Sequence, residues 1–191
     1  MKIQKRKLHS SRRKIIAIMG TPGVGKSTFA KKLSKKLGLE LIEVNKIVDE
    51  YRLYSGKDKF GTKVVKLKEL EKLLNKIAEE KGSAIFEGHL LADLKLRGAI
   101  AIVLREHLPT LYKRLEERGY PYEKIIENLE SEATDYSGLT AERNYKEVYE
   151  FLSSDKSLMK KVKNLLKNRR SKKESIELLE ELIPFIKRSS L

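Results

Sequence analysis

The sequence of 191 residues predicts an α/β fold in which a parallel β-sheet is flanked by helices. Apolar, β-branched runs alternate with segments of helical periodicity along most of the chain. One of these runs, residues 99–104, is apolar throughout, as strands buried on both faces are. A glycine-rich loop, Gly20–Ser27, separates the first run from the first helical segment and fits the phosphate-binding pattern G-x-x-x-x-G-K-[ST].

The order of the elements follows from these periodicities and from the glycines between them. We expect five strands, at residues 14–19, 39–44, 83–87, 99–104 and 148–152. We expect helices at residues 28–37, 45–54, 66–81, 108–119 and 120–136, and one or two amphipathic helices within 156–187. Residues 55–62 are polar and hold two glycines, so we expect a connection there without regular structure.

The glycine-rich loop carries the clearest chemical signal. Its glycines let backbone N–H groups turn towards phosphate oxygens, while the lysine adds a point charge and the hydroxyl is a ligand for Mg²⁺. The flanking strand and helix favour a phosphate site over a chance glycine-rich turn. The predicted nucleotide-binding residues of this loop are Gly20, Pro22, Gly23, Val24, Gly25, Lys26, Ser27 and Thr28.

A second motif, Glu87-Gly88-His89, follows the predicted strand at 83–87. An acid at the tip of a strand beside a P-loop commonly holds Mg²⁺, so Ser27 and Glu87 are the expected metal ligands, with Glu87 acting through water. The imidazole of His89 could orient an acceptor or exchange a proton near neutral pH. A histidine after a strand is also often a structural hydrogen-bonding residue, and both interpretations stay open.

Three arginines form the third candidate group. Arg105 closes the strand at 99–104, and Arg114 and Arg118 lie four residues apart on one helix face. Phosphoryl transfer needs cations over the transferring group, which these side chains could supply. The alternative is a solvated helix face, because two glutamates lie between Arg114 and Arg118.

The formal net charge is +15, and the charge is unevenly distributed. Residues 1–12 form a basic N-terminal arm, and the C-terminal segment 153–191 contains an acid-free basic stretch, Lys156–Lys173. Two such blocks favour a polyanionic partner, most simply RNA, over a surface that is merely solvated. The chain has no cysteine and no apolar run long enough to cross a membrane, so we expect a cytoplasmic or nuclear protein without a membrane partner.

Several of these motifs together resemble the atypical adenylate kinases, a family that also acts in maturation of the small ribosomal subunit. The specific part is R-L-x-x-R-G-Y at 114–120 followed by K-I-x-x-N-x-x-x-E at 124–132. The resemblance implies a nucleoside monophosphate kinase fold with a core at 13–152, an acceptor-binding segment at about 45–66 and a lid at about 119–137. It also implies Mg·ATP as donor, AMP as acceptor, slow ATP hydrolysis, and a protein of the small ribosomal subunit and its rRNA as partners.

The resemblance also implies roles for single residues. Lys26 would grip the β- and γ-phosphates, and His89 would take part in catalysis. Arg114 would pack on the adenine, and Arg118 would contact the transferring phosphate. These roles are expected of the side chains that match the family's motifs.

Two departures from the family's pattern keep the function open. The metal-site acid is normally Asp, and here it is Glu87. In the acceptor-binding segment, Arg52 is the only arginine left to hold an acceptor phosphate, with Arg105 as a second candidate for substrate binding. Besides AMP phosphorylation, the alternatives are therefore a ribosome-assembly ATPase with vestigial kinase activity and a kinase for another small acceptor.

Overall fold

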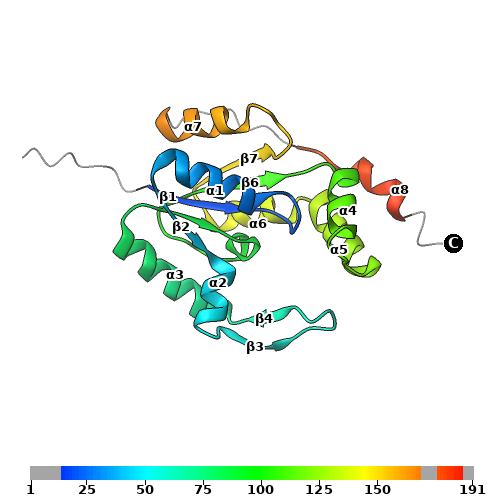
Figure 1. The fold of residues 1–191 in the computed structure, drawn as a ribbon, viewed down its shortest axis with the longest axis horizontal. Coiled ribbons are helices and arrows are strands. Elements are labelled where there is room, and N and C mark those ends of the chain that lie inside the picture. The colour runs from blue at the N-terminus through cyan, green and yellow to red at the C-terminus, as the bar shows by residue number, and fades with distance from the viewer. Residues whose placement is uncertain (1–13, 169–175, 187–191) are drawn as a thin grey trace, which may run out of the picture.

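The computed structural model describes residues 14–168 and 176–186. Its centre is a parallel sheet of five strands in the order β2-β5-β1-β6-β7 (Figure 1). All five predicted strands are confirmed, as is the parallel α/β fold. The strands are β1 (Ile15–Met19), β2 (Glu40–Glu43), β5 (Ala84–Glu87), β6 (Ala99–Arg105) and β7 (Glu147–Leu152).

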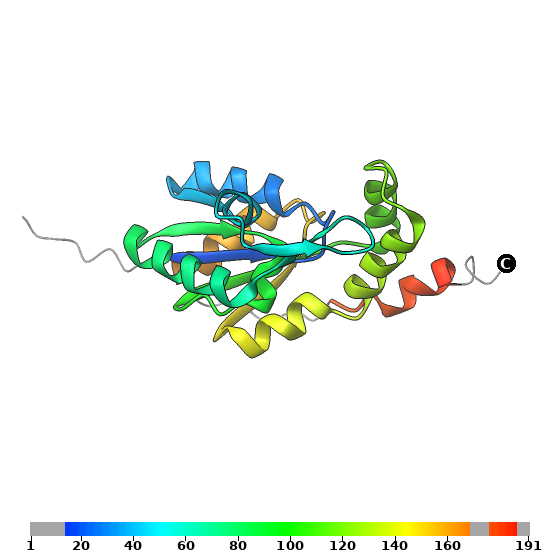
Figure 2. The ribbon, with the colours of Figure 1, turned by 90° about the horizontal axis from the view of Figure 1, so that it is seen from below.

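Helices cover both faces of the sheet. Neighbouring residues of a strand point to opposite sides, so strands that are apolar throughout give the sheet two apolar faces to cover. Ile16 and Ile18 of β1 share one apolar cluster with α1 (Lys26–Leu37) and α7 (Leu158–Asn168). Ala17 and Met19 face the other way, into a cluster with α3 (Leu67–Lys81) and α6 (Tyr136–Asn144). Figure 2 shows α1 and α6 on opposite sides of the sheet.

The helices α4 (Leu108–Glu116) and α5 (Tyr122–Ala133) form a pair at one end of the molecule (Figure 1). The last described residues pack on this pair through the short 3-10 helix η2 (Leu179–Leu182) and α8 (Ile183–Ile186). The rings of Tyr112 and Phe185 stack with centroids 5.2 Å apart. The amphipathic segment expected at 156–187 therefore divides, with α7 on the sheet and the last turns on α4 and α5.

The acceptor-binding segment differs from the expected helix and irregular connection. The helix α2 (Val44–Glu50) is shorter than the predicted one, and Arg52 beyond it has a φ of 50°. A hairpin follows, formed by β3 (Tyr54–Lys57) and β4 (Lys63–Val65). The carboxylate of Asp58 fixes its turn, accepting bonds from the backbone N–H groups of Phe60 and Thr62.

The tip of this hairpin contacts α5. Lys124 Nζ donates to Thr62 Oγ1 over 2.8 Å, and Lys59 pairs with Glu127 at 3.2 Å.

Within the two described ranges, no helix is long and apolar enough to cross a membrane. The expected N-terminal arm at 1–12 and residues 169–173 of the basic stretch lie outside the described residues.

Candidate functional site

The glycine-rich loop connects β1 to α1 and is packed too closely for side chains at two positions. Gly20 has a φ of 135°, and a Cβ there would lie 2.2 Å from the carbonyl oxygen of Leu104 in β6. Gly23 has a φ of 97°, and a Cβ there would lie 2.7 Å from Leu111 of α4. Glycine is therefore required at both positions, and the loop is held against β6 and α4.

Lys26 lies within the curl of this loop. Its side chain is buried, and Nζ donates to the carbonyl oxygen of Thr21 over 2.9 Å. Burial lowers the pKa of Lys26 to about 8, although the carboxylates of Glu87 and Glu132 oppose this shift. Among the described residues no carboxylate bonds directly to this ammonium group, so a bound phosphate would replace its lost hydration.

Ser27 and Glu87 meet beside the lysine, as their positions in the sequence predicted. Ser27 Oγ, in the first turn of α1, donates to Glu87 Oε1 at the end of β5 over 3.2 Å. Burial raises the pKa of Glu87, while Lys26 and the bond from Ser27 lower it. A hydroxyl and a carboxylate oxygen beside a phosphate site are the donors that Mg²⁺ uses, so this pair fits the metal.

His89 follows at the start of the 3-10 helix η1 (His89–Asp93). Burial lowers its pKa to about 4, and the positive charges of Lys26 and Lys124 add to the effect. The imidazole is therefore neutral at pH 7. Gly88 lets Glu87 and His89 approach α2 this closely, because a Cβ at this position would lie 2.9 Å from Cβ of Val44.

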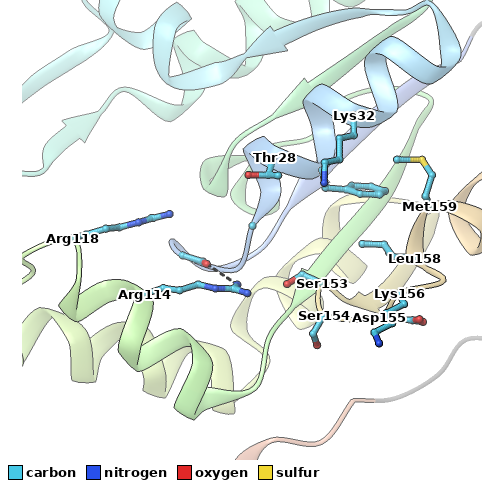
Figure 3. Close-up of a pocket in the computed structure, with 13 residues that line it drawn as sticks. Thr28, Lys32, Arg114, Arg118, Ser153, Ser154, Asp155, Lys156, Leu158 and Met159 are labelled. Atoms are coloured by element: carbon cyan, nitrogen blue, oxygen red, sulfur yellow. Dashed lines mark hydrogen bonds between the residues drawn. The ribbon is translucent and has the colours of Figure 1, made fainter.

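Three adjoining pockets extend along this surface. The largest, of about 560 Å³, is shown in Figure 3 and reaches from the P-loop to residues 153–159. The middle pocket, of about 220 Å³, is lined by Lys26, Ser27, Glu87 and His89. The third, of about 200 Å³, is lined by residues of α2 and the hairpin, including Asp49, Thr62 and Lys63.

These pockets are neighbours, because each shares lining residues with the next. Arg118 and three residues of the P-loop segment line both the first and the second pocket. Asn45 and His89 line both the second and the third. His89 therefore lies at the junction of the middle and third pockets.

Arg114 and Arg118 both extend towards the P-loop from the α4 end of the site (Figure 3). Arg114 Nη1 donates to the carbonyl oxygen of Gly23 over 3.3 Å, and its Nη2 pairs with Glu106 at 2.9 Å. The structure thus brings these two arginines together with Lys26, Ser27, Glu87 and His89 in one cleft.

Arg105 does not join them, and the expectation that it binds substrate is corrected. Its side chain is 0% exposed. Nε pairs with Glu132 and Nη1 pairs with Glu150, both at 3.0 Å. Glu132 also accepts a bond from Thr21 Oγ1, which ties the network to the P-loop. The guanidinium is fully engaged inside the protein, away from all three pockets.

Arg52 is exposed and does not line the third pocket, where the sequence predicted an acceptor-binding arginine. Lys63 and Thr62 line that pocket instead, and neither was predicted from the sequence. The signal available in advance was weak, because only the turn around Asp58 indicates that β4 folds back over α2. Ser153, which lines the first pocket, was also missed because it lies in a loop after β7.

The chain is similar to known proteins over most of its length. A family model described as "AAA domain" matches residues 16–135. A protein of Methanocaldococcus jannaschii named "Putative adenylate kinase" is 30% identical over 172 residues, or 90% of this chain and 96% of that protein. One of the same name from Pyrococcus furiosus is 34% identical over 181 residues, or 91% of this chain and 97% of that protein.

A solved structure shares the fold. The shikimate kinase of Bacteroides thetaiotaomicron has a TM-score of 0.59 over 81% of this chain and 98% of its own, at 17% identity. At that identity the likeness concerns the fold alone, which is the nucleoside monophosphate kinase-like fold that the sequence predicted.

Proposed function

Because the chain belongs to the same family as these archaeal proteins, the adenylate kinase-like P-loop kinases, we propose that it transfers the γ-phosphoryl group of Mg·ATP to AMP. Slow hydrolysis of ATP would occur when AMP is absent. The observation that carries the proposal is the row of three adjoining pockets, in which Lys26 and Ser27 of the P-loop line the middle one. A donor base, a chain of phosphates and an acceptor need such a row.

The middle pocket supplies the groups for phosphate transfer. Lys26 Nζ can exchange its bond with the Thr21 carbonyl for bonds to phosphate oxygens, which also favours the charged amine. Ser27 and Glu87 would hold Mg²⁺, which neutralises charge on those oxygens when bound. Arg118 and Tyr120 line the same pocket. Closure of the proposed lid at 119–137 would exclude water from it.

His89 is placed to act on the acceptor. As a neutral imidazole at the junction of the two pockets, it can donate a hydrogen bond to one phosphate oxygen while its other ring nitrogen accepts one. Holding donor and acceptor in line is the main contribution that a protein makes to phosphoryl transfer. The role we propose for His89 is this positioning, without a charged form.

The third pocket would hold AMP. Lys63 lines it and forms an ion pair with Asp49, so its ammonium group would share its three N–H donors between Asp49 and an acceptor phosphate. The lack of an arginine among the lining residues leaves a second candidate, a kinase for another small acceptor. A panel of nucleoside monophosphates and hydroxyl acceptors with Mg·ATP, and with Lys26→Met as the inactive control, tests this. Preferential consumption of AMP supports the first proposal, and consumption of another acceptor supports the second.

We further propose that the protein acts in the cytoplasm on the small ribosomal subunit, binding its rRNA and one of its proteins. The support is the charge of α7, which has no acidic residue and exposes Lys160, Lys163 and Lys167. This role is compatible with AMP kinase activity. The alternative is an assembly ATPase whose ATP cycle switches partner affinity and whose kinase activity is vestigial. RNA-stimulated release of phosphate without AMP would favour it.

Filter binding to RNA over a range of salt concentrations tests this proposal. Changing the three exposed lysines of α7 to glutamine should weaken binding and lower its salt dependence, by roughly one unit of slope for each lysine that pairs with a phosphate of the RNA. The matched control changes Lys68, Lys72 and Lys76 of α3, where glutamates surround the lysines. Equal binding by both triple variants would make α7 a solvated surface.

A further inference from the structure

Glu106, the residue after β6, carries a carboxylate that is 0% exposed. A charge in the interior is tolerated only when bonded partners replace water. Its Oε2 accepts a bond from Ser153 Oγ over 2.7 Å and pairs with Arg114 Nη2 at 2.9 Å. Its Oε1 accepts a bond from the backbone N–H of His107 over 3.1 Å. Two side-chain partners on Oε2 and one backbone N–H on Oε1 therefore satisfy this carboxylate.

Both side-chain partners line the largest pocket, and they come from different parts of the chain (Figure 3). Arg114 belongs to α4 and also bonds to the carbonyl oxygen of Gly23 in the P-loop. Ser153 follows β7 and lies against the other end of the loop, 3.6 Å from where a Cβ of Gly25 would be. One buried carboxylate thus joins two walls of the pocket to each other and to the P-loop.

Neither Arg114 nor Ser153 lines the middle pocket, where Lys26 and Ser27 lie. A change in the bonds of Glu106 should therefore alter the space for the donor base and leave the phosphate pocket intact. We propose that Glu106 is a positioning residue that shapes the base pocket and so sets how much the base contributes to nucleotide affinity. This inference rests on the proposed use of ATP as donor.

Two ligands separate the base from the phosphates. Calorimetry with ATP and with inorganic tripolyphosphate, both with Mg²⁺, gives the ratio of the two dissociation constants for the wild type and for Glu106→Gln. A glutamine keeps the shape but holds a guanidinium weakly, so we expect ATP to bind about ten-fold more weakly. Tripolyphosphate should bind within about two-fold of the wild type. Glu117→Gln, the same change at an exposed position beside α4, should alter neither constant.

If Glu106→Gln leaves the ratio of the two dissociation constants unchanged, because both ligands weaken equally or neither weakens, the positioning role is overturned. Failure of the wild type to bind ATP would instead overturn the proposed function. If Glu106→Gln does not fold, Glu106→Asp keeps the buried charge but withdraws it from both partners, and the same selective loss for ATP is expected. In an Arg114→Gln background, Glu106→Gln should add less than it does alone, because the two act through one contact. Full additivity there would also contradict the inference.

Discussion

Replacing Arg105 by methionine tests the most heavily buried charge network of the described residues. The guanidinium lies 3.0 Å from one carboxylate oxygen of Glu132 and of Glu150, and 2.7 Å from Asp135, which is partly exposed. Methionine fills most of the volume but leaves two buried carboxylates without their cation. Breaking a buried ion pair from one side costs about 3–5 kcal/mol, out of about 5–15 kcal/mol for a typical domain. We expect Arg105→Met to lower the free energy of unfolding by an amount in the range of the broken ion pair, about 3–5 kcal/mol.

The dependence of this loss on pH identifies its cause. Burial raises the pKa of Glu132 and of Glu150, and Arg105 opposes the rise at both. Without the arginine both pKa values go higher, so the folded protein binds protons that the unfolded chain, with ordinary glutamate pKa values, has released. Stability then falls as the pH rises above the unfolded value, and the loss should be greater at pH 8 than at pH 5.

Urea denaturation followed by circular dichroism at both pH values measures this. The matched control is Arg97→Met, which removes an exposed pair with Glu79 at 3.6 Å and should cost less than about 1 kcal/mol. An equal, small loss for both variants would refute the reasoning about the network. Unchanged stability together with a loss of AMP binding would restore Arg105 to the substrate site.

Three further outcomes are expected. Affinity for ATP should fall above pH 8, by up to about ten-fold per unit, because the pKa of Lys26 near 8 leaves a neutral amine there; calorimetry that shows constant affinity to about pH 9.5 would contradict this. His89→Ala should lower kcat about 100-fold while the ATP dissociation constant stays within about two-fold, as for a group that holds donor and acceptor in line; loss of ATP binding would make His89 structural. Gly88→Ala should lower the free energy of unfolding by about 1–3 kcal/mol, measured by thermal unfolding, because its Cβ would lie 2.9 Å from Cβ of Val44. In the control Gly56→Ala the new Cβ meets no atom within 4 Å, so equal losses would refute the packing argument.

The strands and the P-loop could be predicted because their signals are local. An apolar run before a glycine-rich loop specifies both a buried strand and the start of a helix, and Glu87 follows from its place at a strand end. The hairpin could not be predicted in the same way. Its strands have only four and three residues, which is too short for a clear alternation of polar and apolar positions. Its position also depends on Lys124 and Glu127, which lie on α5, far along the chain from the hairpin.

Arg105 shows the limit of reasoning from residue type. An arginine at the end of a central strand looks equally suited to bind a substrate or to neutralise buried acids. The choice depends on Glu132 and Glu150, which come from α5 and β7 and meet Arg105 only in the folded protein. The role of Glu106 is hidden for the same reason, since Ser153 lies 47 residues away in the sequence.

The measurement that tests the central claim most directly is the stoichiometry of products from Mg·ATP with and without AMP. The proposed kinase should form two ADP for each AMP consumed, with only slow phosphate release when AMP is absent, and Lys26→Met should do neither. Release of ADP and free phosphate at a rate that AMP does not alter would contradict the kinase assignment and favour the ATPase of subunit assembly.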